Sequence, residues 1–215
     1  MANQRHFSPA DRLLMQADSA LRTLLPLSAH PNRPSPAQSQ EEAALSPDET
    51  THIAGLMRIN HTGEVCAQAL YQSQKIVARS PETRAMLDHA AQEEMDHMAW
   101  CEERLSELGS HTSYLNPIWY AGSFGIGLLA GLAGDRWSLG FVAETEKQVE
   151  KHLNSHLETL PLADTRSRAI VDQMRRDEID HGQSAWDAGG KPLPQPIKNA
   201  MEAISKVMTT AAYKV

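Results

Sequence analysis

One acidic motif occurs twice in this chain, and both copies end in a histidine. The first copy is Glu-Glu-Met-Asp-His at residues 93–97, and the second is Asp-Glu-Ile-Asp-His at residues 177–181. Each copy contains Glu-x-x-His, and two residues three positions apart lie on one face of a helix. A third Glu-x-x-His, at Glu49 and His52, is a chance match, because Glu49 completes a capping box at a helix start. The repeat therefore predicts two helices that present the same pair of side chains.

Hydrophobic spacing indicates that both pairs face the protein interior. Glu94 and His97 replace apolar residues on the core-facing stripe of one helical pattern, and Glu178 and His181 do so on another. Strand-like alternation of useful length is absent from the sequence, so we predict an all-α fold, a four-helix bundle with additional short helices. Its four long helices are expected at about residues 48–79, 81–108, 137–160 and 164–188.

The other two long helices each contribute one inward-facing carboxylate. Glu64 lies on the apolar stripe of the first helix, and Glu146 lies on that of the third. Glu144 is about 200° from Glu146 around the helix and points elsewhere. Glu150 is only about 40° away and remains the alternative for that position.

Four carboxylates and two imidazoles cannot lie in an apolar core without compensation, because each unpaired buried charge costs several kcal/mol. Lysine and arginine are absent from the four stripes. Two divalent cations would balance four glutamates, and oxygen ligands with imidazole favour iron or manganese over structural zinc. This matches the ligand pattern of ferritin-like two-metal proteins; a set of salt-bridged core residues is the alternative. The candidate metal ligands are Glu64, Glu94, His97, Glu146, Glu178 and His181.

Four further residues are weaker candidates. Asp96 and Asp180 precede the two histidines and could hydrogen-bond an imidazole N–H, although a solvent-exposed acidic face explains them equally well. His61 and His152 are close in sequence to the lone glutamates and could relay protons; capped or surface histidines are the alternative. Of these, His152 is the possible catalytic residue.

The middle of the chain contains an apolar segment, residues 112–134, without a charged residue. It is long enough to span a bilayer, and Gly127-x-x-x-Gly131 is a small-residue packing pattern. A single crossing would put the first two long helices and the last two on opposite sides, so one metal centre could not form. We therefore expect the segment to stay at the membrane interface or to cover the bundle mouth; a buried core helix is the alternative.

The remaining sequence suggests three parts: an amphipathic N-terminal helix (1–25), a Pro/Ser/Ala-rich linker (26–47) and the bundle domain with its interfacial segment (48–215). The net charge of −7 argues against nucleic acid as a partner. The two cysteines form no disulfide framework and favour a reducing compartment.

Several motifs occur in the order found in one known family. Asn60-His61-Thr62-Gly63-Glu64, the first acidic motif, a lone glutamate and the second acidic motif resemble the demethoxyubiquinol hydroxylases of ubiquinone biosynthesis, which are ferritin-like di-iron monooxygenases. The resemblance covers about residues 56–215. It implies two iron ions on the six candidate ligands, with Glu94 and Glu178 as bridges. Lys147 departs from the pattern, because several members have a second acid after the third-helix glutamate.

The resemblance implies hydroxylation of a polyprenylated demethoxyquinol with dioxygen. The apolar segment predicts a peripheral membrane protein, and a start without a transit-like, Arg-rich pattern favours the cytoplasmic side of a bacterial inner membrane. Ubiquinone-biosynthesis accessory proteins and a homo-oligomer are further expected partners. The alternative from the same ligands is a ferritin-like iron-storage or peroxide-scavenging protein, which has no use for the apolar segment. A non-catalytic lipid-binding scaffold would use that segment but not the buried carboxylates.

Overall fold

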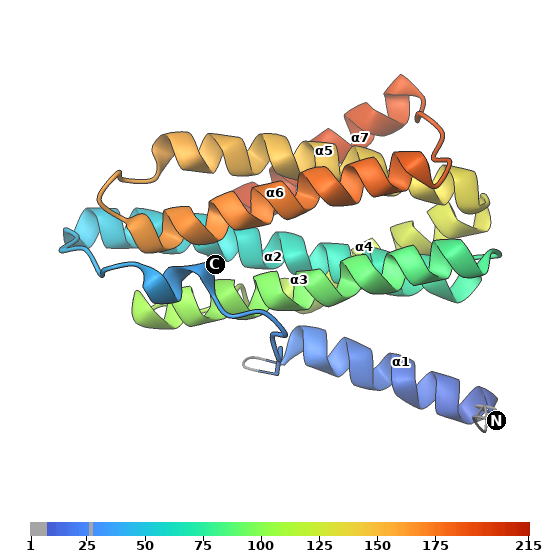
Figure 1. Cartoon of the computed structure of the whole chain (residues 1–215), viewed down its shortest axis with the longest axis horizontal. Helices are drawn as coiled ribbons and strands as arrows, with labels where there is room; N and C mark the ends of the chain where they lie inside the picture. The colour runs from blue at the N-terminus through green and yellow to red at the C-terminus, as the bar shows by residue number, and fades with distance from the viewer. Residues whose placement is uncertain (1–7, 26–27) are drawn as a thin grey trace.

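The computed structural model describes residues 8–25 and 28–215, and the regular structure within these ranges is entirely helical (Figure 1). The predicted all-α fold is therefore confirmed. The elements are α1 (Pro9–Leu24), the short 3-10 helix η1 (Pro36–Ser39), α2 (Pro47–Val77), α3 (Pro81–Glu107), α4 (Asn116–Leu132), α5 (Asp135–Thr159), α6 (Thr165–Asp187) and α7 (Gln195–Ala212).

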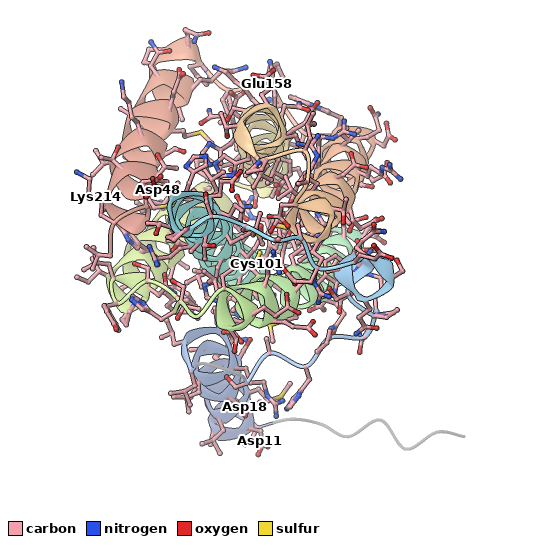
Figure 2. All side chains as sticks on the ribbon, turned by 90° about the vertical axis from the view of Figure 1, so that its left-hand side faces the viewer. Asp11, Asp18, Asp48, Cys101, Glu158 and Lys214 are labelled. Carbon is pink, nitrogen blue, oxygen red and sulfur yellow. The ribbon has the colours of Figure 1, made fainter. Side chains whose placement is uncertain are left out.

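Four long helices, α2, α3, α5 and α6, form the bundle. α2 packs against α3, α5 packs against α6, and α3 and α6 meet across the middle. Local signals set the helix starts: Ser46 and Glu49 form a capping box before α2, and Ser80 caps α3, each with a proline at the first helical position. Cys101 lies in the core, 3.8 Å from the sulfur of Met174 on α6 (Figure 2).

The apolar segment forms α4, which packs along α2 of the same bundle. Gly127 and Gly131 lie at this contact, where a Cβ atom on Gly127 would come within 2.9 Å of the Leu70 backbone. The opposite face is apolar and exposed at Ile118 and Leu129. Within residues 8–25 and 28–215, every helix is too short or too polar to cross a bilayer.

The N-terminal part of the chain lies against the bundle. α1 stands beside it and contacts α2 and α4 (Figure 2). Residues 28–40, which we call the N-terminal strap, follow the bundle surface and bury Ala29 and Ala37. η1, at the end of the strap, packs against α6. Residues 1–7 of the predicted helix and 26–27 of the predicted linker lie outside the described residues. The division of the chain at residues 25 and 47 stays a prediction.

Candidate metal centre

All six predicted ligands are buried in the middle of the bundle, and contacts connect them into one cluster. Each of the four long helices contributes to it. The 3.6-residue periodicity explains the arrangement, because each of these side chains occupies a position that an apolar core residue would otherwise take. The contributors are Glu64 from α2, Glu94 and His97 from α3, Glu146 from α5, and Glu178 and His181 from α6.

Nδ1 of each histidine faces carboxylate oxygens. One ligand atom each from Glu64, Glu94, His97 and Glu178 lie within 4.8 Å of one another. Nδ1 of His97 is 3.0 Å from Oε2 of Glu94 and 3.7 Å from Oε1 of Glu178. Nδ1 of His181 is 3.3 Å from Oε1 of Glu94 and 3.4 Å from Oε2 of Glu178. Glu94 and Glu178 therefore contact both histidines.

Glu146 is the carboxylate that α5 directs into the cluster. The hydroxyl of Tyr71 on α2 donates to Oε1 of Glu146, and Oε2 has no hydrogen-bond partner. Glu150, the alternative from the sequence, instead lines a surface groove between α5 and α7. Glu144 pairs with Lys198 of α7 at 2.8 Å, as expected for a residue on another face.

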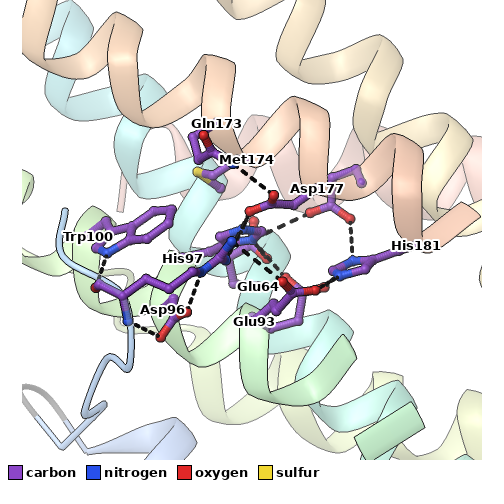
Figure 3. A network of polar contacts seen from close by, with 12 residues as sticks. Glu64, Glu93, Asp96, His97, Trp100, Gln173, Met174, Asp177 and His181 are labelled. Atoms are coloured by element: carbon purple, nitrogen blue, oxygen red, sulfur yellow. Dashed lines mark hydrogen bonds and ion pairs between the residues drawn. The ribbon is translucent and has the colours of Figure 1, made fainter. Parts of the chain in front are cut away.

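Carboxylates on the opposite helix orient both histidines (Figure 3). Nε2 of His97 lies 2.8 Å from Oδ2 of Asp177 on α6, and Nε2 of His181 lies 2.7 Å from Oε2 of Glu93 on α3. The first acid of each motif thus holds the histidine of the other motif. Such a contact fixes the ring orientation and leaves Nδ1 directed at the cluster.

The sequence prediction named the wrong acids for this outer position. Asp180 is exposed, and Asp96 accepts hydrogen bonds from the backbone N–H of Asn32 and from the side chain of Arg33. The residue directly before each histidine does not contact its imidazole, because neighbouring helical residues point about 100° apart. The first acid of each motif, four residues before its histidine, was the signal available in the sequence.

Two other histidines lie outside the cluster. His61 is buried between α2, α3 and α4, with Nε2 3.1 Å from Glu102 and Nδ1 3.3 Å from the Asn116 amide. His152 lies further along α5, with its ring 4.0 Å from that of His156. Burial lowers the pKa of His152, and burial next to His152 lowers the pKa of His156 to about 3. A catalytic role for His152 stays a prediction.

Burial and the neighbouring charges favour bound protons on several groups of the cluster. Burial, and then the charge of Glu94, raises the pKa of Glu64 well above its usual range. Burial and the charge of Glu178 do the same to the pKa of Glu146. Burial alone would lower the pKa of His97, but contacts with the surrounding carboxylates raise it well above the ordinary value. A metal ion bound at this cluster would have to displace these protons.

Several buried polar atoms of the cluster make no hydrogen bond of acceptable geometry, although buried polar groups nearly always make one. An oxygen-rich set with two imidazoles suits divalent first-row metals, and two of these oxygens lie 3.3 and 3.4 Å from Nδ1 of His181. The residues therefore fit a metal centre. The atoms without such a bond are Oε1 of Glu94, Oε2 of Glu146, Oε2 of Glu178 and Nδ1 of His181.

A cavity of about 300 Å³ lies between α1, α2 and α3. Tyr71 lines it, so one residue borders both the cavity and the carboxylate cluster. Charged, amide and apolar side chains share its wall, among them Arg22, Lys75, Asp88, Gln72 and Leu87.

Comparison with known proteins agrees with this geometry. A family described as "Ubiquinone biosynthesis protein COQ7" matches residues 51–212. A protein of Polynucleobacter asymbioticus is 66% identical over 206 residues, which cover 95% of this chain and 98% of that protein. A protein of Stutzerimonas stutzeri is 62% identical over 215 residues, the full length of both chains. Both are named 3-demethoxyubiquinol 3-hydroxylase. The chain therefore belongs to the COQ7 family of ubiquinone biosynthesis proteins, as its motifs predicted.

Proposed function

We propose that this hydroxylase of ubiquinone biosynthesis uses two iron ions and dioxygen to hydroxylate the ring of a polyprenylated demethoxyquinol. The observation that carries the proposal is the cluster of buried glutamates with two histidine Nδ1 atoms directed into it. The names of the relatives supply the substrate and the reaction class. The storage or peroxide-scavenging alternative is not favoured, because the relatives are named as hydroxylases.

We assign the six ligands to two groups. Glu64, Glu94 and His97, from α2 and α3, would hold one ion. Glu146, Glu178 and His181, from α5 and α6, would hold the other. The contacts of Glu94 and Glu178 with both histidines support bridging positions for these two carboxylates.

Bound ferrous iron would supply the redox chemistry that activates dioxygen. The protein's own side chains orient the ligands and keep water away from the site. Asp177 and Glu93 each accept a hydrogen bond from Nε2–H of a histidine, and the Tyr71 hydroxyl donates a hydrogen bond to Glu146. Burial of the cluster excludes bulk water. The cavity beside Tyr71 is the place that we propose for the quinol ring, because Tyr71 lines it and also hydrogen-bonds Glu146 of the cluster.

We also propose that the protein works at the cytoplasmic face of the inner membrane, with α4 and α7 at the interface. A polyprenylated substrate stays in the bilayer, and exposed apolar side chains on a helix bind the boundary of headgroups and acyl chains. Accessory proteins of ubiquinone biosynthesis and a homo-oligomer are further proposed partners. The exposed apolar residues are Ile118, Leu129 and Leu132 on α4, and Ile197, Ile204 and Val207 on α7.

The test of the reaction is direct. Purified protein in detergent, loaded with ferrous iron, is supplied with a demethoxyquinol, a chemical reductant and isotopically heavy dioxygen. Mass spectrometry should find a product that carries one heavy oxygen atom on the ring. An unmodified quinol with a fully iron-loaded protein would contradict the proposed function.

Metal loading is expected to release protons and to become tighter as pH rises. The pKa values of Glu64, Glu146 and His97 are all raised above their ordinary values, so these groups retain protons as the pH rises toward neutrality. Higher pH removes protons that a cation must otherwise displace. Calorimetric titration with Co²⁺ in buffers of different ionisation enthalpy measures the protons released. A binding enthalpy independent of the buffer would contradict the prediction.

A further inference from the structure

We infer that Arg33 of the N-terminal strap is a positioning residue for both histidines of the metal centre. It acts through Asp177 and Glu93, the carboxylates that hold the two imidazole Nε2 atoms. The inference rests on the proposed function in one respect, that His97 and His181 bind metal ions through Nδ1.

The guanidinium of Arg33 contacts carboxylates on two different helices. Nη2 lies 2.9 Å from Oδ2 of Asp177 on α6, and Nη1 lies 3.5 Å from Oε1 of Glu93 on α3. Nη2 is also 3.5 Å from Nε2 of His97. One planar group therefore spans the junction between the helices that carry the two acidic motifs.

The strap itself is fixed on α3 at this point. Asp96 accepts a hydrogen bond from the backbone N–H of Asn32 at 2.6 Å and from Nε of Arg33 at 2.6 Å. The indole N–H of Trp100 donates to the carbonyl oxygen of Arg33 at 3.3 Å, and the guanidinium lies 5.0 Å from the centre of the Trp100 ring. These contacts fix both the backbone and the side chain of Arg33 on α3, although the side chain is 32% exposed.

The arrangement orients the outer carboxylates more than it supplies charge. Asp177 also accepts a hydrogen bond from Gln173 at 2.8 Å, and Glu93 also lies 3.3 Å from Nδ1 of His89. Both of these contacts come from the same helix as the carboxylate, whereas Arg33 reaches both carboxylates from the strap. A guanidinium fork fixes several oxygens at once, whereas a lysine ammonium is a flexible point charge. Arg33 therefore couples the orientation of His97 on α3 to that of His181 on α6.

Positioning and simple charge lead to opposite expectations. As a bare positive charge, Arg33 would repel metal ions, so its removal would tighten metal binding. As a positioning residue, its removal loosens both imidazoles and weakens binding. Loss of an outer contact of a metal-binding histidine costs about 10-fold to 100-fold in affinity.

The experiment compares Arg33→Gln and Arg33→Lys with wild type and with Arg176→Gln. Arg176 is the matched control, because it is an exposed arginine on α6 that pairs with Asp172. Co²⁺ is titrated into each metal-free protein, and proton NMR of the loaded protein records the shifted, exchangeable Nε2–H signals of the two histidines. Both Arg33 variants should bind Co²⁺ about tenfold more weakly, and their Nε2–H protons should exchange faster with water. The Arg176 variant should match wild type.

Two results would overturn the inference. Wild-type affinity in Arg33→Lys with tighter binding in Arg33→Gln would show that only charge matters. A lowered melting temperature in both variants, with unchanged Co²⁺ affinity and unchanged Nε2–H exchange, would show that Arg33 only holds the strap. Failure of the wild-type protein to bind Co²⁺ at the cluster would instead contradict the proposed function, so the two failures are distinguishable.

Discussion

Glu178→Ala is expected to abolish loading of the metal centre while the bundle stays folded. Glu178 contacts Nδ1 of both His97 and His181, so its loss removes an oxygen ligand from both proposed ion positions. Metal affinity should fall by more than about 100-fold, beyond the effect of losing an outer contact. The metal-free bundle should keep its stability, because the change removes one of several mutually repelling buried carboxylates.

Metal analysis and thermal unfolding with and without ferrous iron measure the two effects separately. The free energy of unfolding of wild type should rise by about 2.7 kcal/mol when the free metal concentration is 100 times the dissociation constant. That of the variant should rise by almost nothing. Asp180→Ala is the matched control, because it removes the same charge from an exposed position on the same helix. Full iron loading in Glu178→Ala would contradict the ligand assignment.

Gly127→Ala is expected to destabilise the protein by loosening α4 from α2. The added Cβ would overlap the Ser73 hydroxyl and lie 2.8 Å from the Leu70 carbonyl oxygen. The hydroxyl can rotate away, but the backbone of α2 cannot move without shifting the helix. Overpacking of this kind costs about 1–3 kcal/mol, and more when backbone must move.

Gly125→Ala provides the comparison for this prediction. Gly125 lies on the same helix, and a Cβ there would meet nothing within 4 Å. The free energy of unfolding of this variant should rise by up to about 1 kcal/mol, because alanine has a higher helix propensity than glycine. Urea unfolding of both variants gives the difference. Equal stability of the two variants would contradict the close packing of α4 on α2.

The helices and most of the cluster could be predicted because their signals are local. The expected helix at residues 81–108 is observed at Pro81–Glu107, since Ser80 and Pro81 begin it and Gly109 ends it with positive φ. The inward direction of Glu94 and His97 follows from their places on the apolar stripe. Periodicity alone could not choose between Glu146 and Glu150; packing against Tyr71 and α6 makes that choice.

Contacts between distant segments could not be predicted in the same way. Arg33 lies in an aperiodic, proline-rich stretch, and its position depends on Asp96 and Trp100 of α3. The glycines of α4 suit a partner helix or a lipid interface equally well in sequence, and only the fold shows that Gly127 faces Leu70. Local pattern identifies what a residue can do, whereas tertiary contacts decide which neighbour it meets.

Anomalous diffraction at the iron absorption edge, from crystals of the ferrous-loaded protein, tests the central claim most directly. Two iron positions should appear in the middle of the bundle, with Glu94 and Glu178 near both. One should also lie beside His97, and the other beside Glu146 and His181. Iron found only at the protein surface, or a fully loaded protein with Glu146 directed away from both ions, would contradict the account.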